Sequence, residues 1–337
     1  MNDKLDALIH SEMQQRGIPG LNVMVRQHGK VLEQCSCGFA NLEHGVTVKP
    51  ETVFQIGSIG KQFAATAVML LVEAGKIELE APISTYFSGV QEFWSEVMVQ
   101  HLLTHTAGVP SDFEGVDLRA DLSEDELLQK ILAGTLEFKP GEQYSYSNDG
   151  YKLVGILVSK VTGMFYGDFL QQQIFQPLGM KTAQIIDDAG IIPNRASGYV
   201  YQGTDLKNQD WVSPTFNSTA DGAIYMTLDD FAHWDDALRT ERILSTSSLE
   251  RMWTPTTLND GSISNYGFGW ILHETQGFRC VSHAGEWQGF TAHFFKSLDN
   301  DLSITMLINI AGINIEQITL DILEIFNPIP NPNRNSG

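Results

Sequence analysis

Ser58 and Lys61 stand three residues apart where an extended segment, 52–56, gives way to a helical stretch, 61–72. On a helix this spacing places both side chains on one face, with Cβ atoms roughly 5–6 Å apart. A serine hydroxyl becomes an effective nucleophile when a neighbouring base takes its proton, and a lysine can be that base when its pKa falls well below about 10.4. The pair therefore predicts a nucleophile beside its base.

The surrounding sequence also offers the burial that lowers a lysine pKa. The stretch 61–72 is apolar on nearly every face, as in a helix enclosed by a protein core. By itself the spacing fits a second interpretation, in which Ser58 is a helix N-cap and Lys61 is solvated. The catalytic interpretation is favoured only if the sequence also contains the other residues that an acyl-transfer site needs.

Two further polar motifs occur once each, in chain order after the first. Tyr146 and Asn148 form a Tyr-x-Asn motif in a loop that precedes an apolar helix, 150–162. His283 and Gly285 form a His-x-Gly motif at the end of a predicted strand. Acyl transfer needs a second proton carrier, a group that orients it and backbone N–H groups for an oxyanion, and these motifs supply such residue types.

At these motifs the chain resembles the penicillin-recognising serine hydrolases, the group of class C beta-lactamases, D-specific peptidases and amidases, and beta-lactamase-like esterases. The resemblance covers 20–326 and includes the stretches 53–57, 102–108 and 266–270. It implies an α+β, beta-lactamase/transpeptidase-like fold, with an antiparallel sheet flanked by helices and a mainly helical inserted lobe. It implies no organic cofactor and no metal.

The resemblance also implies roles for the motif residues. Ser58 would form an acyl-enzyme, Lys61 and Tyr146 would share general-base and general-acid work, and Asn148 and His283 would organise them. A tyrosine accepts a proton only near a cation that stabilises its phenolate, and Lys61 is the available cation. The two are therefore a coupled pair, and either can be the base.

The residues after His283 complete the predicted site. The family pattern implies an oxyanion hole formed by the backbone N–H groups of Ser58 and Glu286. Gly285 is interpreted as a point where substrate approaches the strand closely, or else as a bulge or bend. Trp287 either floors an acyl pocket or fills core.

Two positions depart from the pattern of many penicillin-active members. The third motif begins with His283 in place of a lysine, and a histidine is largely neutral near pH 7. This favours an esterase, amidase or aminopeptidase over a true beta-lactamase. Glu286 replaces a small or hydroxylated residue, and its carboxylate either pairs with a substrate amine or faces outward.

The predicted function is hydrolysis of a small ester, amide or peptide through an acyl-Ser58 intermediate, by a beta-lactamase-like esterase in the first instance. A D-amino-acid-specific aminopeptidase or amidase and a beta-lactamase are the enzymatic alternatives. Outside the enzymes, a covalent penicillin-binding or ligand-sensing protein would use the same scaffold.

Elements that position the motifs are predicted from hydrophobic periodicity. We expect strands at both ends of the chain and helices between them: helices at 5–13, 61–72, 124–133, 150–162, 166–174, 228–238 and 315–326, and strands at 21–27, 30–39, 267–273, 278–283, 290–297 and 302–310. This layout predicts one catalytic domain, 1–327, with an α/β lobe (1–57 and 240–327), a helical lobe (58–239) and a disordered tail, 328–337.

Composition narrows the partners. With 21 Lys and Arg against 41 Asp and Glu, the net charge is −20, which repels nucleic acid and anionic membranes. Cys35 and Cys37 are interpreted as buried small side chains, and His101 and His105, four apart, as structural rather than metal-binding residues. The start of the chain lacks the apolar core of a signal peptide, so a cytoplasmic location is expected.

Overall fold

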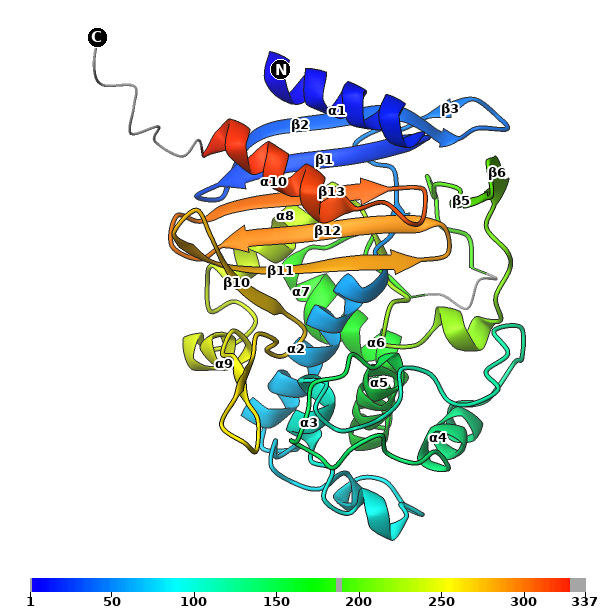
Figure 1. Cartoon of the computed structure of the whole chain (residues 1–337), viewed down its shortest axis with the longest axis vertical. Coiled ribbons are helices and arrows are strands. Elements are labelled where there is room, and N and C mark those ends of the chain that lie inside the picture. The colour runs from blue at the N-terminus through cyan, green and yellow to red at the C-terminus, as the bar shows by residue number, and fades with distance from the viewer. Residues whose placement is uncertain (1, 186–189, 328–337) are drawn as a thin grey trace.

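A seven-stranded antiparallel sheet forms the centre of the computed structural model, which describes residues 2–185 and 190–327. Strands from the two ends of the chain are neighbours within this sheet, because β1, near the N-terminus, pairs with β13, near the C-terminus (Figure 1). In spatial order the strands are β10 (Ile271–Thr275), β11 (Phe278–Trp287), β12 (Phe290–Ser297), β13 (Leu302–Ile308), β1 (Gly20–Gln27), β2 (Lys30–Asn41) and β3 (Val46–Thr47).

One face of the sheet is covered by the two terminal helices, α1 (Asp3–Arg16) and α10 (Ile315–Phe326) (Figure 1). Strand side chains alternate between faces, so Ile304, Met306 and Ile308 of β13 join the helices in one hydrophobic cluster. Leu307, between them in sequence, belongs to the larger cluster on the opposite face. This alternation produces two cores, one on each side of the sheet.

The opposite face carries the larger core and the layer of helices between β3 and β10 in sequence. Helices α2 (Gly60–Glu73) and α5 (Asn148–Thr162) pack on each other at its centre, and α8 (Leu228–Leu238) contacts the sheet (Figure 1). Further helices of this region are α3 (Val99–Leu103), α4 (Glu124–Leu132), α6 (Tyr166–Leu170), α7 (Gln176–Leu178) and α9 (Thr246–Met252). Two short 3₁₀ helices are η1 (Gly57–Ile59), directly before α2, and η5 (Pro214–Asn217). The short strands β4 (Phe54–Gln55) and β7 (Tyr225–Met226) pair with each other.

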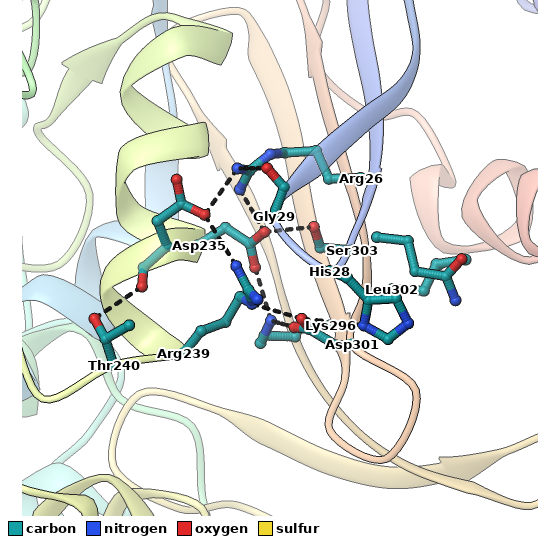
Figure 2. Close-up of polar contacts among 12 residues, drawn as sticks. Arg26, His28, Gly29, Asp235, Arg239, Thr240, Lys296, Asp301, Leu302 and Ser303 are labelled. Atoms are coloured by element: carbon teal, nitrogen blue, oxygen red, sulfur yellow. Dashed lines mark hydrogen bonds and ion pairs between the residues drawn. The ribbon is translucent and has the colours of Figure 1, made fainter.

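A buried network of charges connects α8 to the sheet. The carboxylate of Asp235 accepts hydrogen bonds from Arg26 of β1 at 2.5 Å, Lys296 of β12 at 2.8 Å and Ser303 of β13 at 3.0 Å (Figure 2). Lys296 also contacts Asp301 at 2.7 Å. Three strands and one helix thus share a single carboxylate.

The predicted α+β class and most predicted elements are confirmed. Several predicted strands differ from the observed bounds, and two of them differ by four residues at one end. The first late strand begins at Ile271 rather than at 267, because Gly269 has φ +78° and packs against the backbone of α2. The second continues to Trp287 instead of ending at 283, since its residues remain paired with β12. The predicted disordered tail, 328–337, lies outside the described residues, and the division into two lobes stays a prediction.

No single helix in residues 2–185 and 190–327 is long and apolar enough to cross a membrane. The pair formed by α5 and the segment Tyr166–Leu178 reaches that length and composition only when the two are joined across a 75° bend. Most residues of α5 are buried in the helical layer, as expected for the core helix of a globular domain.

Candidate active site

Ser58 lies in η1, which packs backbone to backbone against β11. Gly57 has φ +53°, a value that favours glycine, and a Cβ there would lie 2.5 Å from the backbone N of Glu286. A Cβ on Gly285 would lie 1.9 Å from the carbonyl oxygen of Ile56 and 2.9 Å from the backbone N of Ser58. The turn that bears the nucleophile therefore requires glycine at 285, and the expected close approach of substrate to this strand stays a prediction.

The same packing brings the two predicted oxyanion donors together. The backbone N of Ser58 faces position 285, and the backbone N of Glu286 faces position 57. β10 pairs with β11 only over Phe278–Ser282, so the later part of that edge of β11 is free to receive η1. The geometry is compatible with the predicted oxyanion hole at the seam between turn and strand.

Lys61 is fully buried in the first turn of α2, and its Nζ is within hydrogen-bond distance of three oxygens. These are the Ser58 hydroxyl at 3.0 Å, the Asn148 side-chain carbonyl at 3.0 Å and the backbone carbonyl of Asp221 at 2.9 Å. The two carbonyl oxygens can only accept hydrogen bonds. A neutral Lys61 that donates its two protons to them directs its lone pair at the Ser58 hydroxyl.

Burial favours that neutral form. It lowers the pKa of Lys61 from its ordinary value to about 7, against an opposing influence of the nearby Asp221 carboxylate. At neutral pH a substantial fraction of the molecules therefore carries an uncharged Lys61 beside Ser58. The alternative interpretation of the motif, an N-cap serine followed by a solvated lysine, is wrong, because Lys61 has no exposed surface.

We expect activity to rise with pH through about 7, because the pKa of Lys61 is about 7 and only its neutral form can accept a proton. The profile of kcat/KM reports the free enzyme, so it is measured between pH 5 and 9 with an ester that has no titrating group. A profile that is flat across this range would exclude Lys61 as the base.

Tyr146 reaches the site from the loop before α5. Ser147 is the N-cap of this helix: its hydroxyl accepts from the Gly150 N–H at 2.9 Å and donates to the Pro110 carbonyl at 2.8 Å. The cap places Asn148 in the first turn and Tyr146 just before it. Tyr146 lies over Lys61, with Nζ 4.8 Å from the ring centroid, and its hydroxyl is within hydrogen-bonding reach of Ser58.

The Tyr146 phenol is held in its neutral form. Burial raises its pKa well above the ordinary value of 10, and a hydrogen bond with Ser58 opposes this only in part. Desolvation therefore opposes the phenolate that Tyr146 would need to act as the base, and the choice between Lys61 and Tyr146 stays a prediction. A neutral phenol at this position is suited to donate a proton.

Tyr146→Phe is expected to lower kcat by roughly 10²-fold, the scale of a lost general acid–base group. Phenylalanine keeps the ring above Lys61 and removes only the hydroxyl. Steady-state hydrolysis of a small ester and a small amide measures the effect, with Tyr144→Phe as the matched control, since Tyr144 is partly exposed and contacts the same aromatic cluster. Unchanged kcat would assign the proton transfers to Lys61 alone.

His283 does not hydrogen-bond to the other motif residues. Its Nδ1 donates to the carbonyl of Ala284 at 2.5 Å, so its Nε2 accepts from the Tyr266 hydroxyl at 2.9 Å. Burial and the charge of Lys61 lower the pKa of His283 to about 3, which keeps the ring neutral. The contacts available for its predicted organising role are the hydrogen bond with Tyr266 and a ring contact with Tyr146, whose centroid is 6.2 Å away.

Glu286 and Trp287 lie at the rim of the cleft. The Glu286 side chain is exposed and accepts a hydrogen bond from the Gly312 N–H at 2.7 Å. Because side chains alternate along β11, it lies on the same face as Ala284, which packs against the cluster under α1 and α10. The indole N–H of Trp287 donates to Asn217 at 3.0 Å, and this residue lines the cleft. The substrate contacts expected of both residues stay predictions.

The cleft has a volume of about 160 Å³ and is lined by three acidic residues, Asp112, Asp221 and Glu286. Lys152 of α5 also lines it, but this lysine is buried and is paired with Asp149 at 2.9 Å and Asp112 at 3.1 Å. Sequence reasoning missed Asp112, Lys152 and Asp221 as site residues, because they lie in loops or helices without a motif. Lys152, four residues after Asn148 on the same helix, was the one local signal available.

No group of three or more His, Cys, Asp or Glu side chains is placed to hold a metal ion within the described part of the chain. His101 and His105 do not form such a group.

Comparison with known proteins yields one family and several relatives. The family model described as Beta-lactamase matches residues 5–321. Penicillin-binding protein 4* of Bacillus subtilis is 29% identical over 309 residues, covering 85% of this chain and 67% of its own length. The D-aminopeptidase of Brucella canis is 28% identical over 326 residues, covering 91% of this chain and 60% of its own length. This chain thus spans about three fifths to two thirds of these relatives.

Solved structures show the same fold. The octameric penicillin-binding protein homologue from Pyrococcus abyssi superposes with a TM-score of 0.85 at 28% identity, covering 97% of this chain and 77% of that one. The D-amino acid amidase from Ochrobactrum anthropi superposes with a TM-score of 0.81 at 23% identity, covering 97% and 99%. With the family match over nearly the whole chain and the Ser58–Lys61 contact, the protein belongs to the beta-lactamase family and is a serine hydrolase.

Proposed function

We propose that this enzyme hydrolyses small amides, and esters of the same acyl groups, whose acyl part carries a free amino group, through an acyl-Ser58 intermediate. Neutral Lys61 takes the proton of Ser58 as the hydroxyl attacks the carbonyl, and Tyr146 gives a proton to the departing amine or alcohol. Water then attacks the acyl-enzyme with the same groups acting in reverse. The contact of Lys61 Nζ with the Ser58 hydroxyl at 3.0 Å carries the hydrolytic part of this proposal.

The charges of the cleft support the preference for an amine. Asp112, Asp221 and Glu286 line a cleft together with one cation, Lys152, which is buried and already paired with Asp112 and Asp149. A substrate ammonium would be attracted to these carboxylates, whereas a substrate carboxylate would be repelled. A beta-lactam carboxylate would meet the neutral His283 in place of the family's usual lysine.

Relatives at 28% identity named D-aminopeptidases support the same choice, so a D-amino acid is the favoured acyl part. The sequence-based first choice, an esterase, remains the alternative. Two observations favour the esterase. The cleft is small, and the attack of Ser58 on a carbonyl does not itself require a charged substrate. The two differ in whether a free amine is needed.

The deciding experiment compares D-alanine p-nitroanilide, its L-enantiomer, N-acetyl-D-alanine p-nitroanilide and p-nitrophenyl acetate. The amine should raise kcat/KM by about tenfold or more over the N-acetyl compound, the scale of one charge-assisted hydrogen bond. Asp112→Asn and Glu286→Gln should each reduce that ratio, and Asp210→Asn, an exposed carboxylate outside the cleft, should not.

Equal kcat/KM for the free and acetylated amines, with rapid turnover of the acetate ester, would replace this proposal with the esterase. If both cleft variants keep the preference for the free amine, the proposed substrate class would stand. The carboxylates of Asp112 and Glu286 would then be excluded as the cause of the preference.

A further inference from the structure

His105 lies directly behind Tyr146 and has no part in the reaction steps above. It follows α3, is 2% exposed and has φ +57°. A non-glycine residue in the left-handed region is uncommon, and one that is buried there is held by its surroundings. The contacts that hold His105 are therefore informative.

Two of these contacts bracket Tyr146 in sequence. The backbone carbonyl of His105 accepts from the Ser145 N–H at 2.9 Å, and its ring Nδ1 accepts from the Ser147 N–H at 3.0 Å. The main chain on each side of Tyr146 is thus fixed to the same residue. The left-handed backbone of His105 allows its carbonyl and its ring to face the same segment.

The ring of His105 also supports the ring of Tyr146. Their centroids are 4.3 Å apart with an interplanar angle of 35°. On its other sides the imidazole contacts Tyr266 at 4.7 Å and Tyr151 at 5.0 Å, both fully buried. The Tyr146 ring is thus in contact with both His105 and Lys61, whose Nζ lies 4.8 Å from the Tyr146 centroid.

We propose that His105 is a positioning residue that holds the Tyr146 hydroxyl against Ser58 by fixing the Tyr146 main chain at both sides and its ring from behind. The inference rests on the proposed acyl-Ser58 reaction. A shift of about 1 Å in such a group is enough to lower the rate by roughly 10²-fold. His105 acts through Tyr146 and touches no reacting atom.

The protonation state of His105 agrees with this role. Because Nδ1 accepts a hydrogen bond from the Ser147 N–H, the ring proton resides on Nε2. Nε2 is buried and has no hydrogen-bond partner in the described part of the chain. A buried polar group without a partner destabilises the folded state, so an apolar side chain would fill this space at lower cost. Burial, Lys61 and His283 hold the pKa of His105 far below 6.5 and keep it neutral.

Two variants separate the contacts. His105→Asn tolerates the left-handed backbone and keeps an acceptor for the Ser147 N–H, but loses the ring. His105→Phe keeps a ring and loses the acceptor. The matched control is His101→Asn, because His101 also accepts a backbone N–H, that of Met98 at 3.1 Å, and has no ring contact with Tyr146.

We expect both His105 variants to lower kcat by roughly 10- to 100-fold with KM nearly unchanged, when rates are normalised to sites titrated with a fluorophosphonate. His101→Asn should match wild type. A second readout is the pH profile of kcat/KM for p-nitrophenyl acetate, in particular its acid limb, where activity rises with pH. Loss of the ring in His105→Asn admits water, so the lowered pKa of Lys61 should rise and the limb should move to higher pH.

A shift of the acid limb is attributed to Lys61 because His105→Asn leaves the other groups around Lys61 unchanged. These groups are Ser58, Asp112, Tyr146, Asn148, Tyr151, Lys152, Asp221 and His283. A purely structural role would lower the melting temperature without moving the limb. Wild-type kcat in either His105 variant, an equal loss in His101→Asn, or failure of both His105 variants to fold would overturn the inference. Wild-type protein without turnover of any substrate would instead refute the proposed function.

Discussion

Ser58→Ala should abolish hydrolysis, with kcat lower by on the order of 10⁶, the scale found when the nucleophile of a serine hydrolase is removed. The substitution deletes one oxygen from η1 and leaves the close packing of Gly57 and Gly285 intact. Lys61 retains its two carbonyl acceptors on Asn148 and Asp221, so its position is preserved. The loss would therefore report chemistry rather than folding.

Intact-protein mass spectrometry with a small activated ester measures this directly. Wild type should show a transient acyl adduct while product accumulates beyond one equivalent, and Ser58→Ala should show neither. The melting temperatures of the two proteins serve as the control for folding. Turnover in the variant would refute Ser58 as the nucleophile, and a persistent stoichiometric adduct on wild type would identify a covalent acyl-binding or sensing protein.

Asp235→Ala should destabilise the protein by about 3–5 kcal/mol, the usual effect of removing one partner from a buried ion pair. Asp235 is 2% exposed and is shared by Arg26 and Lys296, whose side chains are each 4% exposed (Figure 2). Alanine would leave two buried cations with one carboxylate fewer between them. Equilibrium unfolding in urea, followed by fluorescence, gives the change in the free energy of unfolding.

Asp236→Ala is the matched control from the next position of α8. Its carboxylate, whose side chain is 39% exposed, pairs with Arg26 at 2.8 Å and Arg239 at 3.4 Å. Solvent screens such a pair, so the expected loss is about 1 kcal/mol or less. Equal losses for the two variants would show that burial does not determine the strength of this network.

Two of the buried lysines, Lys61 and Lys296, have opposite arrangements. Lys296 is surrounded by the carboxylates of Asp235 and Asp301, which keeps its charge compensated. Lys61 has hydrogen-bond acceptors around it but no ion pair among the described residues, and burial lowers its pKa to about 7. The first arrangement stabilises the joint between α8 and the sheet, and the second provides a base.

Local patterns in the sequence were sufficient for most of the fold. The periodicity of 61–72 and 315–326 predicted α2 and α10, and the patterns of 21–27 and 30–39 predicted β1 and β2. Such patterns depend on neighbours a few residues away, so the sequence displays them. The beginning of β10 was mispredicted because Gly269 packs against α2, a contact with a distant segment.

The sequence by itself also determined the residue types of the site: the Ser58–Lys61 spacing, the Tyr-x-Asn and His-x-Gly motifs, and through them the family. Only the tertiary structure decided how these residues act. Lys61 finds Asn148 and Asp221 from segments 87 and 160 positions away, and the enclosure by those segments lowers its pKa while raising that of Tyr146. Desolvation and long-range contacts depend on the whole fold, and no local spacing records them.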